Sequence, residues 1–307
     1  MDLHELSEKF YTSKAGAGRS PHTITTYKMH ITDFLKWCDS IGYTASDLVG
    51  VTGAEVIEEH FLHMRLDRDL SESTICGRFR SLRSLYRWVE RRVGPIDGGN
   101  PFTWLTQPTE PDLLPKHITF ADLTLLLHSI PAQSFKGDHW LNCRDRLVIK
   151  ALFYTGLRSG ELVSLRISDV DIPNRKMRVM RWKTGTEAFI PLSRSLADDL
   201  QLWLNVQRPA VPHDGLWVVS DGHYRPTVET MQYTALRHIL RRRCEDASMK
   251  RYGPHSFRHG CAAYIIQRGG DISLVKDLLG HRSIETTQQY LRFDVSRLAA
   301  GLDRIFD

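Results

Sequence analysis

The residues best suited to chemistry lie in the last third of the chain, where two imidazoles, a guanidinium and a phenol fall within a short run. They are His255, Arg258, His281 and Tyr290, and a second guanidinium, Arg158, lies earlier in the run TGLRSGEL. Arginine presents paired N–H groups to an anion and keeps its proton. A phenol ionises near pH ~10, so a tyrosine nucleophile needs neighbouring positive charge at neutral pH. The set therefore combines anion binding with a nucleophile.

Each of these residues has an ordinary structural explanation when taken alone. A solitary Arg is usually a surface residue, a solitary His caps a helix or sits in a core, and a solitary Tyr packs. Their context favours function. Gly156 stops a helix just before Arg158, so Arg158 projects from a turn. Arg258 lies three residues after His255 and so on the same helix face. His281 follows a second helix stop directly.

The order and spacing of these residues resemble the catalytic signature of the tyrosine recombinases, the family of phage and transposon integrases and Xer-type resolvases. Tyr290 follows His281 at the family spacing. The resemblance implies site-specific DNA recombination, in which a phenol attacks a phosphodiester and leaves a 3′-phosphotyrosine and a free 5′ hydroxyl. It implies no metal ion and no cofactor, so fixed donors must meet the charge that gathers on the phosphate in the transition state.

The resemblance also implies a role for each residue. Arg158 and Arg258 hold the non-bridging oxygens, His255 hydrogen-bonds the phosphate and helps to move the proton of the nucleophile, and His281 braces the phosphate. Glu161 lies three residues after Arg158 and matches an acidic position that orients the site. A surface salt bridge is the competing explanation for Glu161.

The family places its general acid, which protonates the departing 5′ oxygen, in a hairpin turn, where Lys183 lies. Most lysines at such a turn simply stay in water. Lys176 and Arg181 are close in sequence and are alternatives to Lys183. His259 lies four residues beyond His255, which suits a metal pair, but no Glu stands between them as the HExxH motif requires. We therefore predict no metal site.

A mixed helical and β domain must position these residues, and we predict it over residues 117–307. Apolar periodicity predicts helices near residues 119–127, 144–154, 193–205, 227–244, 255–267, 271–279 and 283–291. Short β segments at 177–182 and 188–192 flank the KTGT turn and predict a hairpin. In the 227–244 helix we predict that Arg241 and Arg242 bind DNA.

The first 107 residues predict four helices, with Ser20, Thr52 and Ser71 at cap positions. The fourth helix carries an apolar stripe and many arginines. One-sign clustering of arginine favours a polyanion partner over a merely solvated helix face. Such a domain resembles the SAM-like core-binding domain of tyrosine recombinases. The residues predicted to contact DNA are Arg78, Arg80, Arg83 and Arg87.

A Pro- and Gly-rich stretch separates the two parts, and we place an interdomain linker at 108–116. Two domains joined in this way are expected to close around a duplex. The predicted fold class is thus mainly α with a small β-sheet, a four-helix core-binding domain followed by an α+β catalytic domain. No leading arm-binding segment is evident, which resembles the compact, Xer-like form of the family.

Composition sets outer limits on the function. A net charge of +5 and a pI near 8.9 suggest nucleic acid only mildly. Five scattered cysteines without a CxxC motif indicate reduced thiols. No apolar run is long enough for a membrane span, and the first residues lack a signal pattern. We therefore expect a cytoplasmic, nucleoid-associated protein.

Apolar residues at helical spacing from Val295 to Ile305 predict a tail helix. By the resemblance this tail docks on a neighbouring protomer and forms a homo-tetramer on double-stranded DNA with inverted repeats, with accessory proteins as further partners. A type IB topoisomerase or telomere resolvase shares the chemistry, and a non-catalytic DNA-binding regulator shares the scaffold. The intact residue set argues against the regulator, and a zinc- or cysteine-dependent hydrolase lacks its ligand spacing.

Overall fold

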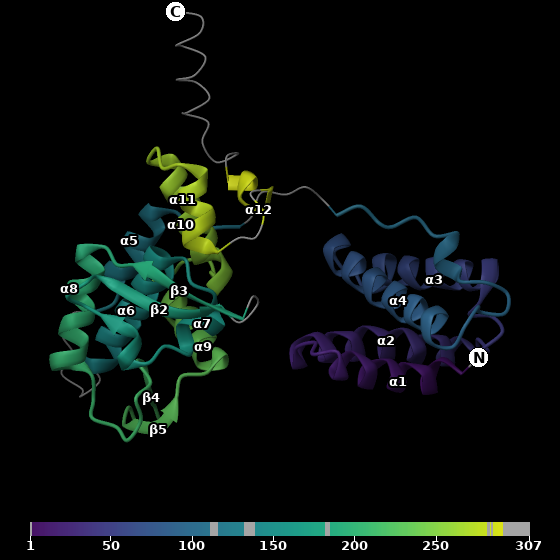
Figure 1. Ribbon diagram of the computed structural model, residues 1–307, viewed down its shortest axis with the longest axis horizontal. Helices are drawn as coiled ribbons and strands as arrows, with labels where there is room; N and C mark the ends of the chain where they lie inside the picture. The colour runs from purple at the N-terminus through teal and green to yellow at the C-terminus, as the bar shows by residue number, and fades with distance from the viewer. Residues whose placement is uncertain are drawn as a thin grey trace, which may run out of the picture. The chain divides into compact units, whose positions relative to one another are not determined.

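The computed structural model describes residues 2–110, 116–131, 139–181, 185–280, 283 and 285–290. The chain divides into two compact units, Met1–Leu113 and Leu114–Asp307. Both are mainly helical, and two small antiparallel sheets lie in the second (Figure 1). The predicted fold class is confirmed, while the predicted domain limits stay predictions. None of the described helices has the length and apolar character needed to cross a bilayer.

The described part of the first unit is built on four α-helices. At three of them Asp2, Ser20 and Ser71 accept a hydrogen bond from a backbone N–H of the first turn. Such a cap satisfies a donor that has no partner inside the helix. The elements are α1 (Leu3–Gly16), α2 (Pro21–Ile41), α3 (Gly50–Leu66), α4 (Glu72–Arg92) and the 3-10 turn η1 (Pro101–Thr103).

Helix α3 differs from the prediction at its start. Thr52 does not cap it, because the helix begins at Gly50 with Val49 at the N-cap and no side-chain cap. Gly50 has a φ of +63°, and its N–H donates to the carbonyl of Gly99 at 2.8 Å. A Cβ on Gly50 would lie 2.5 Å from the carbonyl oxygen of Gly98. A backbone contact with residues 98–99 therefore sets this helix start, and the local sequence does not reveal it.

The apolar stripe of α4 forms much of the core of the first unit. Phe79, Leu82 and Tyr86 are each at most 1% exposed and pack with residues from the other three helices. The hydroxyl of Tyr86 donates to the carbonyl of Leu48 at 2.9 Å. The stripe predicted for this helix is therefore confirmed, and it leaves the remaining faces of α4 to its arginines.

In the second unit, two antiparallel sheets accompany the helices. In the first, β2 (Lys176–Arg181) lies between β1 (Val170–Asp171) and β3 (Thr186–Pro191), and Met177 pairs with Ile190. The predicted hairpin is confirmed. The described α-helices are α5 (Phe120–Ser129), α6 (His139–Thr155), α7 (Ser159–Val163), α8 (Arg194–Leu202), α9 (Tyr233–Asp246), α10 (Pro254–Gln267), α11 (Ile272–Leu279) and α12 (Glu285–Gln288). A 3-10 turn, η2 (Ile167–Asp169), and a π-helical segment, η3 (Trp203–Gln207), accompany them.

The second sheet corrects one helix prediction. The helix expected over 227–244 begins only at Tyr233, because residues 226–230 form strand β5 (Pro226–Thr230). Strand β5 pairs with β4 (Val218–Ser220). The β-branched Thr227 and Val228 suit a strand better than a helix. This hairpin precedes α9 and sets where α9 starts.

Two glycines bring the ends of α6 and α11 together. Gly156 ends α6 with a φ of +61°, and Gly280 ends α11 with a φ of +64°. A Cβ on Gly156 would lie 2.4 Å from Cδ2 of Leu279, and one on Gly280 would lie 3.0 Å from Cζ of Arg181. Both predicted helix stops are confirmed. The chain reverses at each stop in a space too tight for a side chain, which fixes the segments next to Arg158 and before His281.

Candidate active site

Arg158 occupies the N-cap of the short helix α7, just after the turn at Gly156. Its backbone N–H donates to Oε2 of Glu161 at 2.9 Å, and its Nη1 donates to Oε1 at 2.8 Å. The Arg158 side chain is 28% exposed. Glu161 therefore fixes one side of the guanidinium while another side remains accessible to a ligand.

Glu161 is shared by two arginines and is 2% exposed. Besides Arg158, Nη1 of Arg181 donates to its Oε2 at 3.2 Å. Arg181 also donates to the carbonyls of Leu278 and Leu279, at 2.7 and 3.1 Å. Burial lowers the pKa of Arg181, although Glu161 opposes this shift. Arg181 thus ties the end of β2 to the end of α11.

Arg258 projects from α10 and is 5% exposed. Its guanidinium donates to the carbonyls of Gly156 and Leu279, at 2.5 and 2.6 Å. Burial, together with the charge of Arg158, lowers the pKa of Arg258 to about 10. The side chain therefore stays charged at neutral pH, and its other N–H groups remain to meet an anion.

Arg158, Arg181 and Arg258 form one connected group with Glu161, which we call the arginine network. The Leu279 carbonyl accepts from Arg181 and Arg258, and Glu161 accepts from Arg158 and Arg181. Within these four side chains a single carboxylate faces three guanidiniums, so the network carries net positive charge. Donors held in place in this way suit an anion such as a phosphodiester.

His255 lies in the first turn of α10, three residues before Arg258, and its side chain is exposed. Although His255 is exposed at its surface, partial desolvation of its ring, together with the charges of Arg258 and Arg158, lowers its pKa. The imidazole is therefore neutral at pH 7 and able to take up a proton. The structure places it on the same short helix segment as Arg258, as the sequence predicts.

Tyr290 is 1% exposed and packs against residues of α10 and α11. Its hydroxyl lies 2.7 Å from Nδ1 of His259, and the two ring centroids are 5.6 Å apart. Burial raises the pKa of Tyr290 to about 12, with the charge of Arg258 acting in the opposite direction. Sequence reasoning considered His259 only as a metal ligand and missed this contact; its place directly after Arg258 was the available signal.

Two predicted catalytic residues, Lys183 and His281, lie outside the described residues, as does the tail from Val295. The described alternatives to Lys183 have other partners. Lys176 lies 3.6 Å from the Asp171 carboxylate, and Arg181 belongs to the arginine network. Among the described residues, no three His, Cys, Asp or Glu side chains gather as metal ligands would.

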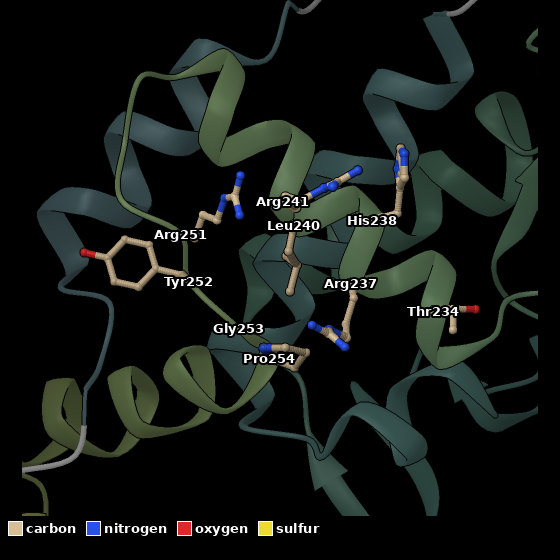
Figure 2. A pocket seen from close by; sticks show the side chains of 9 residues that line it. All are labelled: Thr234, Arg237, His238, Leu240, Arg241, Arg251, Tyr252, Gly253 and Pro254. Carbon is tan, nitrogen blue, oxygen red and sulfur yellow. The ribbon is translucent and has the colours of Figure 1, made fainter. Parts of the chain in front are cut away.

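A basic pocket is lined in part by the residues that directly precede His255 in the chain. Its volume is about 410 Å³, and its lining includes Arg237, Arg241 and Arg251 as well as Pro254. Figure 2 shows Arg237 and Arg241 leaving the same helix, α9, while Arg251 comes from the segment that leads to Pro254. Of the two arginines predicted to bind DNA here, Arg241 therefore lines a concave basic surface.

Arg242 is placed differently from its neighbour Arg241. Its Nη2 donates to Oδ2 of Asp145 at 2.6 Å. Asp145 is fully buried and also binds Arg144 and Arg243, both in the core of the unit. The geometry therefore gives Arg242 a structural partner inside the fold.

Helix α4 presents a second basic hollow, in the first unit. Its volume is about 340 Å³. The cationic side chains that line it are Lys14, Arg80, Arg83, Arg87 and Arg91. Arg80 pairs with Glu110 at 2.9 Å, and Arg83 donates to Gln107 at 3.2 Å. Three of the four arginines predicted to bind DNA in this unit therefore share one surface.

The fourth predicted DNA contact of this unit, Arg78, is 7% exposed and forms an ion pair with Asp33. It lies on the same helix as the arginines of the hollow but does not line it. Its guanidinium is held within the unit, so the geometry favours a structural role for Arg78.

Family models match most of both units. Residues 117–297 match the phage integrase family, and residues 6–94 match the phage integrase N-terminal SAM-like domain. Among similar proteins, "Tyrosine recombinase XerC" of Chromobacterium violaceum is 28% identical over 304 residues, covering 98% of this chain and 94% of that protein. "Tyrosine recombinase XerD" of Pasteurella multocida is 27% identical and covers 91% of this chain and 90% of its own.

Solved structures share the fold. The XerH site-specific recombinase bound to a palindromic difH substrate, in a post-cleavage complex, has a TM-score of 0.72 at 23% identity, with 98% of this chain and 84% of that chain covered. The Tn1549 transposon integrase in complex with transposon right end DNA has a TM-score of 0.73 at 19% identity, with 100% of both chains covered.

Proposed function

The chain belongs to the phage integrase family of tyrosine recombinases, and on this premise we propose that it is a site-specific DNA recombinase. It cleaves and rejoins DNA strands through a 3′-phosphotyrosine intermediate. The reaction is an exchange of esters, so the energy of the broken phosphodiester is kept in the protein–DNA bond until a strand is resealed.

The proposed cleavage step uses Tyr290 as the nucleophile. Its phenolic oxygen forms a bond to the scissile phosphorus as the bond from phosphorus to the 5′ oxygen breaks. The phenolic proton passes to His255, and the departing 5′ oxygen takes a proton from Lys183. Rejoining runs the same steps in reverse with the 5′ hydroxyl of a partner strand.

The observation that carries the proposal is the arginine network. Arg158 and Arg258 are proposed to bind the non-bridging oxygens, where negative charge gathers in the transition state. Both are held before substrate arrives, Arg158 by Glu161 and Arg258 by two backbone carbonyls. His281, which follows the carbonyl-anchored end of α11, is proposed to brace the same phosphate. This mechanism uses no metal ion or cofactor.

The proposed partner is double-stranded DNA with an inverted-repeat core site. The hollow on α4 is lined by Arg80, Arg83 and Arg87. Arg241 lines the basic pocket of the second unit. Guanidiniums in such concave surfaces bind backbone phosphates without reading sequence. We also propose that the protein acts at the nucleoid in the cytoplasm and that accessory proteins assist it.

We propose that the chain works as a homo-tetramer on DNA, assembled by the tail after Val295. Deletion of residues 295–307 should reduce tetramer formation on a paired site while single-site DNA binding persists. The measurement is native gel mobility combined with recombination of a two-site plasmid. Unchanged recombination by the shortened chain would contradict the role of the tail.

A nicked suicide substrate carrying the DNA site tests the chemistry. The wild-type chain should form a covalent adduct that survives denaturing electrophoresis, and Tyr290→Phe should form none. Tyr86→Phe is a matched control, because it also removes a buried phenol hydroxyl but lies in the first unit. An adduct with Tyr290→Phe would overturn the proposed nucleophile.

The second candidate function is a type IB topoisomerase or telomere-resolvase activity, which shares the cleavage step. The family relatives favour recombination. A supercoiled plasmid with two sites separates the two functions: a recombinase exchanges flanking segments between sites, whereas a topoisomerase relaxes the plasmid and leaves its sequence order intact.

A further inference from the structure

His259 makes a contact that the proposed cleavage step leaves unused. It lies on α10 directly after Arg258 and is partly buried. Its Nδ1 lies 2.7 Å from the hydroxyl oxygen of Tyr290, a normal distance for a hydrogen bond. The imidazole therefore contacts the very atom that would attack phosphorus.

The surroundings make this contact important for the placement of Tyr290. The ring of Tyr290 packs in an apolar cluster with Ala262, Ile266, Val275 and Leu279, all at most 1% exposed. That cluster holds the ring but offers its hydroxyl no polar partner. A buried hydroxyl without a hydrogen bond costs about 1–3 kcal/mol. The hydrogen bond with His259 offsets this cost and ties the phenolic oxygen to α10.

The electrostatics fix the charge of the imidazole. Burial is the main cause that lowers the pKa of His259 to about 4, and His255, Arg258 and His117 add to the shift. The ring is therefore neutral at pH 7, and in the tautomer with its proton on Nδ1 it donates to the hydroxyl oxygen of Tyr290. The phenolic proton of Tyr290 then stays available for transfer to His255.

We propose that His259 is a positioning residue for the nucleophile: its Nδ1–H donates a hydrogen bond to the hydroxyl oxygen of Tyr290 and holds that oxygen in the orientation from which it attacks the DNA phosphate. This proposal rests on the proposed nucleophilic role of Tyr290. His259 is not the base of the reaction, because a nitrogen with a pKa of about 4 draws the phenolic proton only weakly.

Two substitutions separate the hydrogen bond from the shape of the ring. His259→Phe keeps a ring but removes the hydrogen-bond donor, whereas the side-chain amide of His259→Asn can still donate near the position of Nδ1. His30→Phe is the matched control, since His30 is a buried imidazole whose Nδ1 lies 2.8 Å from the hydroxyl of Ser81 in the first unit.

The experiment measures the single-turnover rate of covalent adduct formation by the full-length protein on a nicked suicide substrate at saturating DNA, from pH 5.5 to 9. We expect His259→Phe to lower the rate roughly tenfold to a hundredfold, as a misplaced reacting atom does. The Kd for DNA should not change. His259→Asn should recover most of the rate, with a pH profile of unchanged shape. His30→Phe should cleave at the wild-type rate.

Two outcomes would overturn the proposal. One is a wild-type rate for His259→Phe; the other is an equal loss in His259→Phe and His259→Asn that follows their melting temperatures, which would make His259 a packing residue only. Failure of the proposed function has a separate signature. If Tyr290→Phe still forms the adduct, the nucleophile is wrong; if it forms none while His259→Phe reacts normally, only the positioning role fails.

Discussion

The arginines of α4 and those of the arginine network carry the same charge but are held in different ways. On α4, Arg80 and Arg87 are exposed and line an open hollow. In the second unit, Arg181 and Arg258 are at most 5% exposed, and backbone carbonyls accept their hydrogen bonds. The first set lies at the solvent, where Arg80 has an exposed ion pair with Glu110, and the second is fixed before any ligand arrives.

This difference separates DNA affinity from catalytic rate. Exposed guanidiniums bind phosphates by releasing counterions, so they contribute affinity that falls with salt. Fixed guanidiniums contribute most when charge develops on one phosphate, because they need not reorganise at that moment. The same residue type should therefore give different losses in the two regions when it is replaced.

The largest loss is expected at Arg258. Arg258→Lys keeps the charge but cannot donate to Gly156 and Leu279 while also presenting paired N–H groups to a phosphate. Adduct formation at saturating DNA should fall roughly a thousandfold, with little change in DNA affinity. Arg166→Lys is the control, an exposed arginine of the same unit paired with Asp214. Equal rates for Arg258→Lys and wild type would show that the fixed arginines of the network do not contribute to the cleavage rate in the way proposed.

The next loss is expected at Glu161. Glu161→Gln leaves Arg158 and Arg181 with a neutral partner at a buried site. Removing one member of a buried ion pair costs about 3–5 kcal/mol of stability, and we expect a loss of that order. The cleavage rate should fall roughly tenfold to a hundredfold as Arg158 loses its orientation. Chemical denaturation and single-turnover cleavage measure the two effects.

Asp214→Asn is the matched control for Glu161, because it alters an acid–arginine pair that is exposed on both sides. Exposed pairs contribute at most about 1 kcal/mol. If Glu161→Gln were as mild as Asp214→Asn in both measurements, the network would not be fixed in the way described.

Local sequence was sufficient for the parts of this site that depend on neighbouring residues. The helix stop at Gly156 and the shared turn of Arg158 and Glu161 follow from short-range pattern. The role of Arg181 does not, because its partners include Leu278 and Leu279, almost a hundred positions away in the chain. Only the tertiary fold places a strand end against a helix end.

Arginines that look alike in the sequence also show that local sequence does not determine the role of each side chain. Arg78 and Arg83 lie on one helix, yet Arg78 is buried against Asp33 whereas Arg83 lines the hollow. Arg241 lines a pocket, while its neighbour Arg242 binds the buried Asp145. Sequence predicted a basic helix correctly, but which arginines face outward depends on where single acidic residues of other helices fall.

A smaller effect is expected on α4. Replacing both Arg83 and Arg87 with Gln should weaken DNA binding roughly tenfold to fiftyfold at 0.15 M salt and reduce the slope of log K against log salt by about 2. The cleavage rate at saturating DNA should stay at the wild-type value. Fluorescence anisotropy over a salt series measures the slope.

Arg78→Gln sharpens the same test, because Arg78 shares the helix but is buried with Asp33. It should lower the melting temperature of the protein while leaving the salt slope of DNA binding unchanged. A change of slope equal to that of an exposed arginine would mean that Arg78 does reach DNA, and the distinction between buried and exposed arginines would fail within a single helix.

The smallest effect concerns the pH dependence of stability, and it compares one buried histidine from each unit. His60 in the first unit is 1% exposed, and burial lowers its pKa to about 4, the same value that burial gives His259 in the second. A histidine whose pKa is lower in the folded state binds fewer protons than in the unfolded state. Its contribution to stability is therefore complete above about pH 6.5 and is lost as the pH falls toward 4.

His60→Phe removes this titration while keeping a ring in the aromatic cluster, where the ring centroids of His60 and Phe34 are 5.2 Å apart. Between pH 7.5 and 5.5 the wild-type protein should lose about 1 kcal/mol of stability through His60, and the variant should not. Unfolding curves at the two pH values measure the difference. Parallel losses in both proteins would place the acid sensitivity elsewhere, because His60 would then have the same pKa in the folded and unfolded states.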